Sequence, residues 1–167
     1  MRSARRWSGA TRLAFGVGGL IGLLGLSSCS LLPFLHGKPV IRVKFTTSAD
    51  LNNCGKAGTA PLTLRVFQVT DASALTGERT TLSRVWRHET DEFGTVLVGS
   101  PLEQVLRAGQ PAELSLDRDP KAKAVVVVAN FCKTQGSCWF VVRPLKGGGG
   151  AKLELNAGAT CLQETRR

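Results

Sequence analysis

Four consecutive valines between two alanines, at positions 124–129, leave few folds open to this 167-residue chain. The run Ala124-Val125-Val126-Val127-Val128-Ala129 contains no polar residue, so a strand formed by it has to be covered on both faces. Valine is stiff at χ1 and suits a pleated sheet better than a helix. The run therefore predicts a central, buried strand.

Shorter strand patterns lie on both sides of this run. Apolar and polar residues alternate from Val40, and a second strand is predicted over Leu62–Val69, after Pro61. Residues 48–60 between them are rich in Asn and Gly and predict a loop. Further strands are predicted at Thr95–Val98, Leu102–Arg107, Ala112–Leu116, Ala122–Phe131, Trp139–Arg143 and Lys152–Leu155.

One segment has helical signals instead. Asp71 is predicted to cap a short helix at Ala72–Leu75. A second helix is predicted from about residue 80 to about residue 89, with the insertion ending at Gly94 and an apolar stripe formed by Leu82, Val85 and Trp86. Many short strands with one helical insertion predict a mainly β protein, an antiparallel β-sandwich. Long βαβ alternation is missing, which argues against a parallel α/β fold.

The first 28 residues have the pattern of an export signal. A basic head without acidic residues precedes the apolar run Leu13–Leu26, and Ser27 and Ser28 then lead to Cys29. A cysteine at this point is typical of bacterial lipoproteins, in which it is acylated and becomes the first residue of the mature chain. Fourteen apolar residues span about 21 Å as a helix, less than the ~30 Å of a hydrocarbon core, which disfavours an uncleaved transmembrane anchor.

The sequence therefore predicts three parts. Residues 1–28 are a lipoprotein signal peptide, residues 29–38 a lipidated tether, and residues 39–167 a β-sandwich domain. Residue 30 is serine rather than aspartate, which favours export to the outer membrane in bacteria that resemble the enteric case. We expect a lipid-anchored protein on the periplasmic face of that membrane.

The charge of the mature chain is basic but dispersed. Without the four arginines of the signal, 18 basic residues face 12 acidic ones, a net charge of +6. Arg42, Lys44 and Arg65 alternate with apolar neighbours, as solvent-facing strand positions do. This distribution predicts a solvated surface and no nucleic-acid partner, with weak attraction to anionic lipid head groups at most.

Four cysteines follow Cys29. In an oxidising periplasm Cys54, Cys132, Cys138 and Cys161 predict one or two disulfides. Cys132 and Cys138 flank a five-residue polar stretch and are expected to pair across a hairpin, which leaves Cys54 for Cys161, although four cysteines allow three connectivities. All four are expected at one end of the sandwich. Zinc is disfavoured because the spacing is wide and no histidine is near.

Candidate catalytic groups do not form a recognisable site. His36 lies in the tether and His88 on the polar side of the predicted helix. No Lys-Ser or Lys-Thr follows Gly147–Gly150, so a flexible link is predicted there rather than a phosphate loop. Asp117 and Asp119 lie in a turn, where aspartate caps the backbone. No enzyme, cofactor or metal site is predicted.

Several motifs together resemble one known family. They are Pro-Leu-x-Leu-Arg-Val-Phe-Gln-Val-x-Asp from Pro61 to Asp71, Leu-x-x-Val-Trp from Leu82 to Trp86, the Gly109-Gln110 turn, Val-Val-Ala-x-Phe from Val127 to Phe131, and the strand led by Trp139. The pattern is similar to the TssJ lipoprotein family of the bacterial type VI secretion system. The chain departs from it at Phe140, where members often have arginine or lysine, and in its cysteine pairs, which are not general in the family.

The resemblance implies a fold, a partner and a binding loop. It implies a transthyretin-like β-sandwich, held at the outer membrane by lipid on Cys29, that binds the periplasmic domain of the inner-membrane protein TssM. The binding loop would be Asp50 to Ala60, with candidate contacts at Asp50, Leu51, Asn52, Asn53, Gly55 and Lys56. The alternative is a lipoprotein that binds a small ligand or glycan between its sheets.

Overall fold

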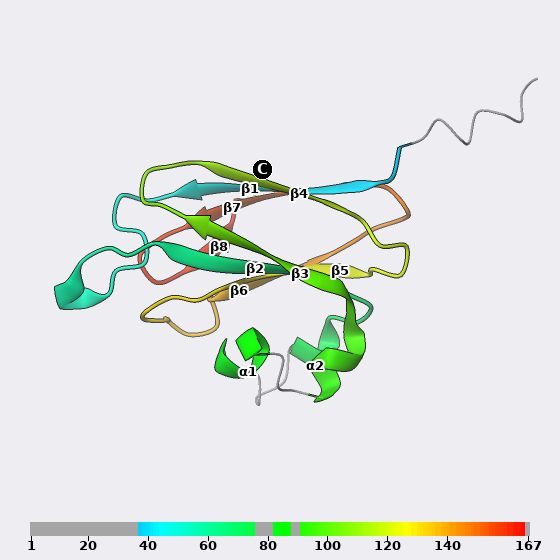
Figure 1. Ribbon diagram of the computed structural model, residues 1–167, viewed down its shortest axis with the longest axis horizontal. Helices are drawn as coiled ribbons and strands as arrows, with labels where there is room; N and C mark the ends of the chain where they lie inside the picture. The colour runs from blue at the N-terminus through cyan, green and yellow to red at the C-terminus, as the bar shows by residue number, and fades with distance from the viewer. Residues whose placement is uncertain (1–36, 76–81, 88–90, 166–167) are drawn as a thin grey trace, which may run out of the picture. The chain divides into compact units, whose positions relative to one another are not determined.

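The computed structural model describes residues 37–75, 82–87 and 91–165, and Lys38–Arg167 form one compact unit. Two four-stranded sheets lie one upon the other as a transthyretin-like β-sandwich (Figure 1). One sheet has the strand order β4-β1-β7-β8 and the other β3-β2-β5-β6. The strands are β1 (Val40–Thr47), β2 (Leu62–Val69), β3 (Leu97–Leu106), β4 (Ala112–Asp117), β5 (Ala124–Ala129), β6 (Phe140–Pro144), β7 (Ala151–Ala157) and β8 (Leu162–Glu164).

Neighbouring strands are antiparallel except for one pair. β1 is antiparallel to β4 on one side and parallel to β7 on the other. Its residues Ile41, Val43 and Phe45 are fully buried between the sheets, while Arg42 and Lys44 point to solvent. The period-two pattern of the sequence therefore matches a strand with one buried face.

The valine run forms β5, which confirms the predicted central strand. β5 pairs with β2 and with β6, and all six of its residues are buried. One face packs in the core between the sheets. The helical insertion lies over the outer face of the same sheet (Figure 1), where its described parts are the 3-10 turn η3 (Ser73–Leu75), α1 (Leu82–Arg87) and α2 (Asp91–Val96).

Arg65 connects this insertion to the sheet. Its guanidinium lies 4.4 Å from the centroid of the Trp86 ring and donates to the Trp86 carbonyl. The Nε and Nη2 atoms of Arg65 are 2.7 and 2.6 Å from Oε1 of Glu103 on β3. Trp86 is half-buried against the core, as the predicted apolar stripe requires. At the start of the insertion, a hydrogen bond from the Ser73 amide (2.8 Å) lowers the pKa of Asp71, which caps η3 as predicted.

Two strand predictions were wrong in detail. Helix α2 continues to Val96, past Gly94, so the strand predicted to begin at Thr95 begins only at Leu97. The two strands predicted on either side of Gly99 are one strand, β3, because Gly99 (φ 71°) absorbs a break in the β2–β3 register without ending the strand. The last strand, β8, was not predicted, since three residues are too few to show a period.

The strand registers define two ends of the sandwich. At the N-terminal end, Val40 lies opposite Asp117, and Val69 and Pro144 flank Ala124. At the other end are the β1–β2 loop, the β5–β6 hairpin turn and the β7–β8 turn (Figure 1). Both disulfides lie there, so we call it the disulfide end. The two ends are separated by the eight residues of β1, about 26 Å of strand.

A buried arginine organises the N-terminal end. Arg118, only 7% exposed, donates to four backbone carbonyls, those of Ala122, Lys146, Gly147 and Gly149. Its amide donates to the Pro39 carbonyl at 2.7 Å. The glycine run predicted as a flexible link is therefore held in place by a guanidinium. A buried guanidinium needs acceptors for its N–H groups, and the backbone carbonyls of this run supply them.

Gly150 provides a test of this packing. A Cβ on Gly150 would lie 2.5 Å from the Val40 carbonyl oxygen, whereas one on Gly149 would have nothing within 4 Å. We expect Gly150→Ala to lower the free energy of unfolding by about 1–3 kcal/mol, because the backbone of β1 has to move. Gly149→Ala is the matched control and should change it by less than about 0.5 kcal/mol. Urea unfolding checks both, and equal effects of the two variants would contradict the close approach.

Candidate functional site: the loops of the disulfide end

Four connections lie at the disulfide end. One is the β3–β4 turn (107–111), whose Gly109 amide donates to the Ser48 carbonyl at 3.3 Å. The β1–β2 loop (residues 48–61) crosses from one sheet to the other, the β5–β6 turn (130–139) belongs to one sheet, and the β7–β8 turn (158–161) to the other. Backbone hydrogen bonds join the loop to the β7–β8 turn, with Asn52 donating to Gly158 (3.2 Å) and Asn53 to Ala159 (2.8 Å). These hydrogen bonds hold the loop against the sandwich independently of the disulfides.

The structure pairs Cys54 with Cys132 and Cys138 with Cys161. The predicted pairing of Cys132 with Cys138, and of Cys54 with Cys161, was therefore wrong. The hairpin ladder ends at the hydrogen bond from Ala129 to Trp139 (2.8 Å), and beyond it the two cysteines turn toward different neighbours. The expectation that all four lie at one end is confirmed.

The two disulfides connect different layers of the molecule. Cys54–Cys132 joins the β1–β2 loop to the β5–β6 turn, and Cys138–Cys161 joins that turn to the opposite sheet. Their sequence separations are 78 and 23 residues. In the chain-entropy model, bridges of these lengths stabilise the native state by about 3–5 kcal/mol each. A polar loop without a core of its own is thereby kept in one conformation.

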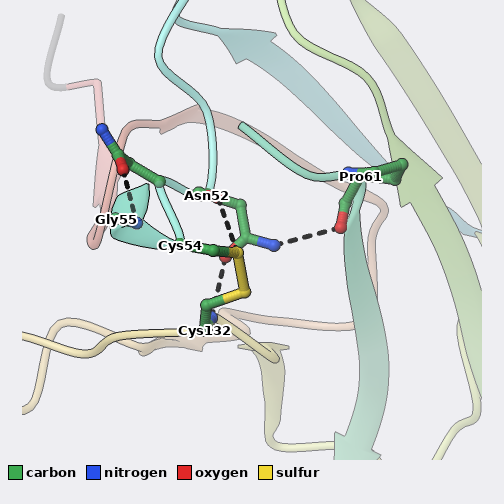
Figure 2. The surroundings of a disulfide bond; sticks show 6 residues. Asn52, Cys54, Gly55, Pro61 and Cys132 are labelled. Atoms are coloured by element: carbon green, nitrogen blue, oxygen red, sulfur yellow. Dashed lines mark hydrogen bonds between the residues drawn. A yellow bond between two sulfur atoms is a disulfide. The ribbon is translucent and has the colours of Figure 1, made fainter. Parts of the chain in front are cut away.

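Asn52 is the hydrogen-bonding centre of the loop (Figure 2). Its side chain is 3% exposed, Nδ2 donates to the Pro61 carbonyl at 3.0 Å, and Oδ1 accepts from the Cys132 amide at 2.8 Å. It is the one non-glycine residue of the described chain with positive φ (47°). Asparagine tolerates this conformation better than most residues. One amide group therefore joins both ends of the loop to the neighbouring turn.

The tip of the loop is a small ordered hairpin. Asn53 and Thr59 form a β-bridge, and the Cys54 amide donates to the Gly58 carbonyl at 2.8 Å. Between them lies the 3-10 turn η2 (Gly55–Ala57). Asn53 Oδ1 accepts from the Gly55 amide at 2.8 Å, drawn as a dashed line to Gly55 in Figure 2. The backbone of the tip is thus satisfied internally, and its side chains are available to a partner.

The six residues predicted as partner contacts fall into two groups. Asp50, Asn53, Gly55 and Lys56 are exposed around the loop. Leu51 is fully buried in the core and Asn52 is buried beneath the tip. The structure therefore separates residues that shape the loop from residues that can touch a neighbour, a distinction that residue type alone does not make.

A further residue at this site was not predicted. Lys133, from the β5–β6 turn, lies over the loop, and a Cβ placed on Gly55 would be 2.7 Å from its Nζ atom. The two positions are brought together by the Cys54–Cys132 bond. The sequence signal that places Lys133 beside the loop is the adjacent Cys132. That signal could be used only once the pairing of Cys132 with Cys54 was known.

A cleft of about 930 Å³ lies elsewhere, between the edge strands β3 and β4 toward the N-terminal end. Val98, Leu102 and Leu116 contribute its apolar lining. Its polar Gln68 is already engaged, since Nε2 donates to the Asp117 carbonyl (2.9 Å) and Oε1 accepts from the Asp119 amide (2.8 Å). The lining also includes Lys38, Ser100, Ser115, Asp117 and Asp119, so the cleft combines apolar surface with charged and hydroxyl side chains.

Among residues 37–75, 82–87 and 91–165, no three His, Cys, Asp or Glu side chains gather closely enough for a metal site. In the same part of the chain, no helix is both long and apolar enough to cross a bilayer. The predicted signal peptide, the lipidation site Cys29 and the histidines His36 and His88 lie outside the described residues.

Comparison with known proteins identifies the family. The model described as "Type VI secretion lipoprotein, VasD, EvfM, TssJ, VC_A0113" matches residues 39–160. The chain belongs to this family. It is a lipoprotein component of the type VI secretion system, which confirms the resemblance seen in its motifs and the prediction that it is not an enzyme. No curated protein matches it by sequence.

Solved structures share the fold at low sequence identity. The type VI lipoprotein TssJ1 from Pseudomonas aeruginosa is 20% identical with a TM-score of 0.68, over 78% of this chain and 98% of that one. Serratia marcescens Lip, a membrane-bound component of the type VI secretion system, is 16% identical with a TM-score of 0.68, over 78% and 99%. A chain of the structure described as "T6SS protein TssM C-terminal domain (869-1107) from EAEC" is 14% identical with a TM-score of 0.61, over 77% and 99%.

Substitutions at position 52 separate the two ways in which Asn52 stabilises the loop, its side-chain hydrogen bonds and its tolerance of positive φ. Asn52→Gly keeps the backbone conformation but leaves the Pro61 carbonyl and the Cys132 amide without partners, so we expect a loss of about 1–3 kcal/mol in unfolding free energy. Asn52→Ala should lose about 1–2 kcal/mol more, because alanine is strained at positive φ. Chemical denaturation with the disulfides intact measures both. An alanine variant as stable as the glycine variant would contradict the strained position.

Proposed function

We propose that this type VI secretion lipoprotein is the outer-membrane anchor of the secretion complex, and that it holds the periplasmic domain of TssM through its β1–β2 loop. The observation that carries the proposal is the position of that loop. It lies at the disulfide end, on the far side of the sandwich from Lys38, with Asp50, Asn53 and Lys56 exposed. A chain of similar fold in a structure described by the TssM C-terminal domain supports the choice of partner.

The attachment geometry agrees with an anchor. Lys38 follows Cys29 by nine positions, so a lipid on that cysteine would hold the domain within about 30 Å of the bilayer. Each buried CH₂ of an acyl chain contributes about 0.8 kcal/mol, so several long chains retain a folded domain without a spanning helix. The β1–β2 loop lies at the end of the sandwich opposite Lys38, where an inner-membrane partner would reach it from the periplasm.

The alternative function, binding a small ligand or glycan between the sheets, has less support. The space between the sheets is filled by buried side chains such as Phe45, Leu64 and Val66. The cleft beside β3 and β4 remains for a ligand, but its Gln68 amide is engaged with the protein backbone.

The membrane anchor is tested by the lipidation site. We expect Cys29→Ser to remove the acyl mass from the N-terminus and to shift the protein out of the outer-membrane fraction, either as soluble protein or as retained precursor. Density-gradient fractionation and mass spectrometry of the native protein measure this. An unacylated wild-type protein, or an unchanged outer-membrane fraction in the variant, would refute the proposal.

The partner is tested by co-purification. The full-length lipoprotein, extracted in detergent, should capture the periplasmic domain of TssM, and Lys56→Glu should weaken capture by about tenfold because it reverses an exposed charge on the loop. Lys121→Glu, on the exposed turn at the N-terminal end, is the matched control and should bind as the wild type does. Failure of the wild-type protein to capture TssM would reject the proposed function.

A further inference from the structure

A second exposed segment adjoins the β1–β2 loop. Residues 132–137, in the β5–β6 turn, are all exposed. The Cys54–Cys132 disulfide and the hydrogen bond from the Cys132 amide to Asn52 (2.8 Å) fix this turn against the loop (Figure 2). Two segments that are distant in sequence are thereby held as one continuous surface, and neither can move without the other.

The charged groups of this surface are mainly basic. Lys56 belongs to the loop and Lys133 to the turn, and both are exposed. Asp50 is the one acidic residue in the sequence of the two segments, 48–61 and 130–139. Among the described residues, no ion pair involves Lys56 or Lys133. The lysines of the β1 and β7 strands differ, since Lys44 is 3.3 Å from Glu113 and Lys152 is 2.7 Å from Glu154.

Lys133 is directed to the loop by the absence of a side chain at Gly55. Its Nζ atom occupies space that a Cβ at position 55 would approach to 2.7 Å. Gly55 also has φ 77°, a conformation in which other residues are strained. The glycine therefore brings a second ammonium group to the base of the tip that carries Lys56.

We propose that the partner-binding surface extends beyond the β1–β2 loop onto residues 132–137, and that Lys56 and Lys133 together bind an acidic segment of the partner protein. The inference rests on the proposed function and adds to it the charge of the partner's contact region. Ammonium groups without an internal counter-ion attract carboxylates across an interface and set its orientation and association rate. The two disulfides keep both groups in place before the partner arrives, which reduces the entropy lost on binding.

Charge variants of Lys133 test the proposal. The detergent-extracted full-length protein is titrated with the TssM periplasmic domain at low and at high salt. Lys133→Glu should weaken binding by about tenfold at low salt and Lys133→Gln by about threefold, because only the first reverses the charge. The loss should shrink at high salt, where exposed charges are screened. Lys146→Glu, an exposed lysine at the N-terminal end, is the control and should leave affinity unchanged.

The outcomes distinguish the extended binding surface from the proposed function, in which the β1–β2 loop binds TssM. If the wild type binds TssM and Lys56→Glu weakens binding, but Lys133→Glu does not, the extended surface is wrong and the loop-borne function stands. If the wild type does not bind, both fail. Binding of the wild type to vesicles containing phosphatidylglycerol, lost in Lys133→Glu while TssM affinity is unchanged, would assign the lysines to lipid and overturn the proposal. Unchanged melting temperatures of the variants establish that they fold.

Discussion

The burial of β5 on both faces is the constraint on which the rest of the structure depends. Because its valines pack against the opposite sheet and against the helical insertion, β5 is fixed between β2 and β6. The hairpin turn that follows it then projects from a rigid base at the disulfide end. Cys132 and Cys138 lie in this turn, and each holds a different neighbouring segment. An apolar strand thus determines where a polar surface is presented.

Several interactions, most of them individually small, hold the candidate binding surface in one conformation. A single hydrogen bond stabilises a fold by about 1 kcal/mol, and the side chain of Asn52 makes two of them in a buried position. The disulfides contribute more, but only Cys54–Cys132 acts on the loop directly. Leu51 adds core packing immediately before Asn52. Covalent, polar and apolar contributions meet within four residues, which leaves the exposed tip free to serve a partner.

The sequence predicted the elements whose pattern depends on burial. β1, β2 and β5 follow from alternation or from continuous apolar character, because each strand's side chains report directly on its two faces. The cysteine pairing did not follow, since it depends on how loops 78 residues apart meet in space. The role of Asn52 was hidden for the same reason. An asparagine in a loop is exposed in most contexts, and only the arrival of the Cys132 amide and the Pro61 carbonyl makes it a buried link.

The parallel pairing of β1 with β7 matters for how the domain carries tension. In the proposed arrangement, the envelope pulls on the chain before Val40 and the secretion apparatus pulls on the loop after Thr47, so the load runs lengthwise along β1. This strand is flanked by β4 on one side and β7 on the other over most of its length. Its ladders are loaded in shear, with all the hydrogen bonds resisting at once rather than opening one after another. In that arrangement the ladders on both sides of β1 would carry the pull between membrane and partner.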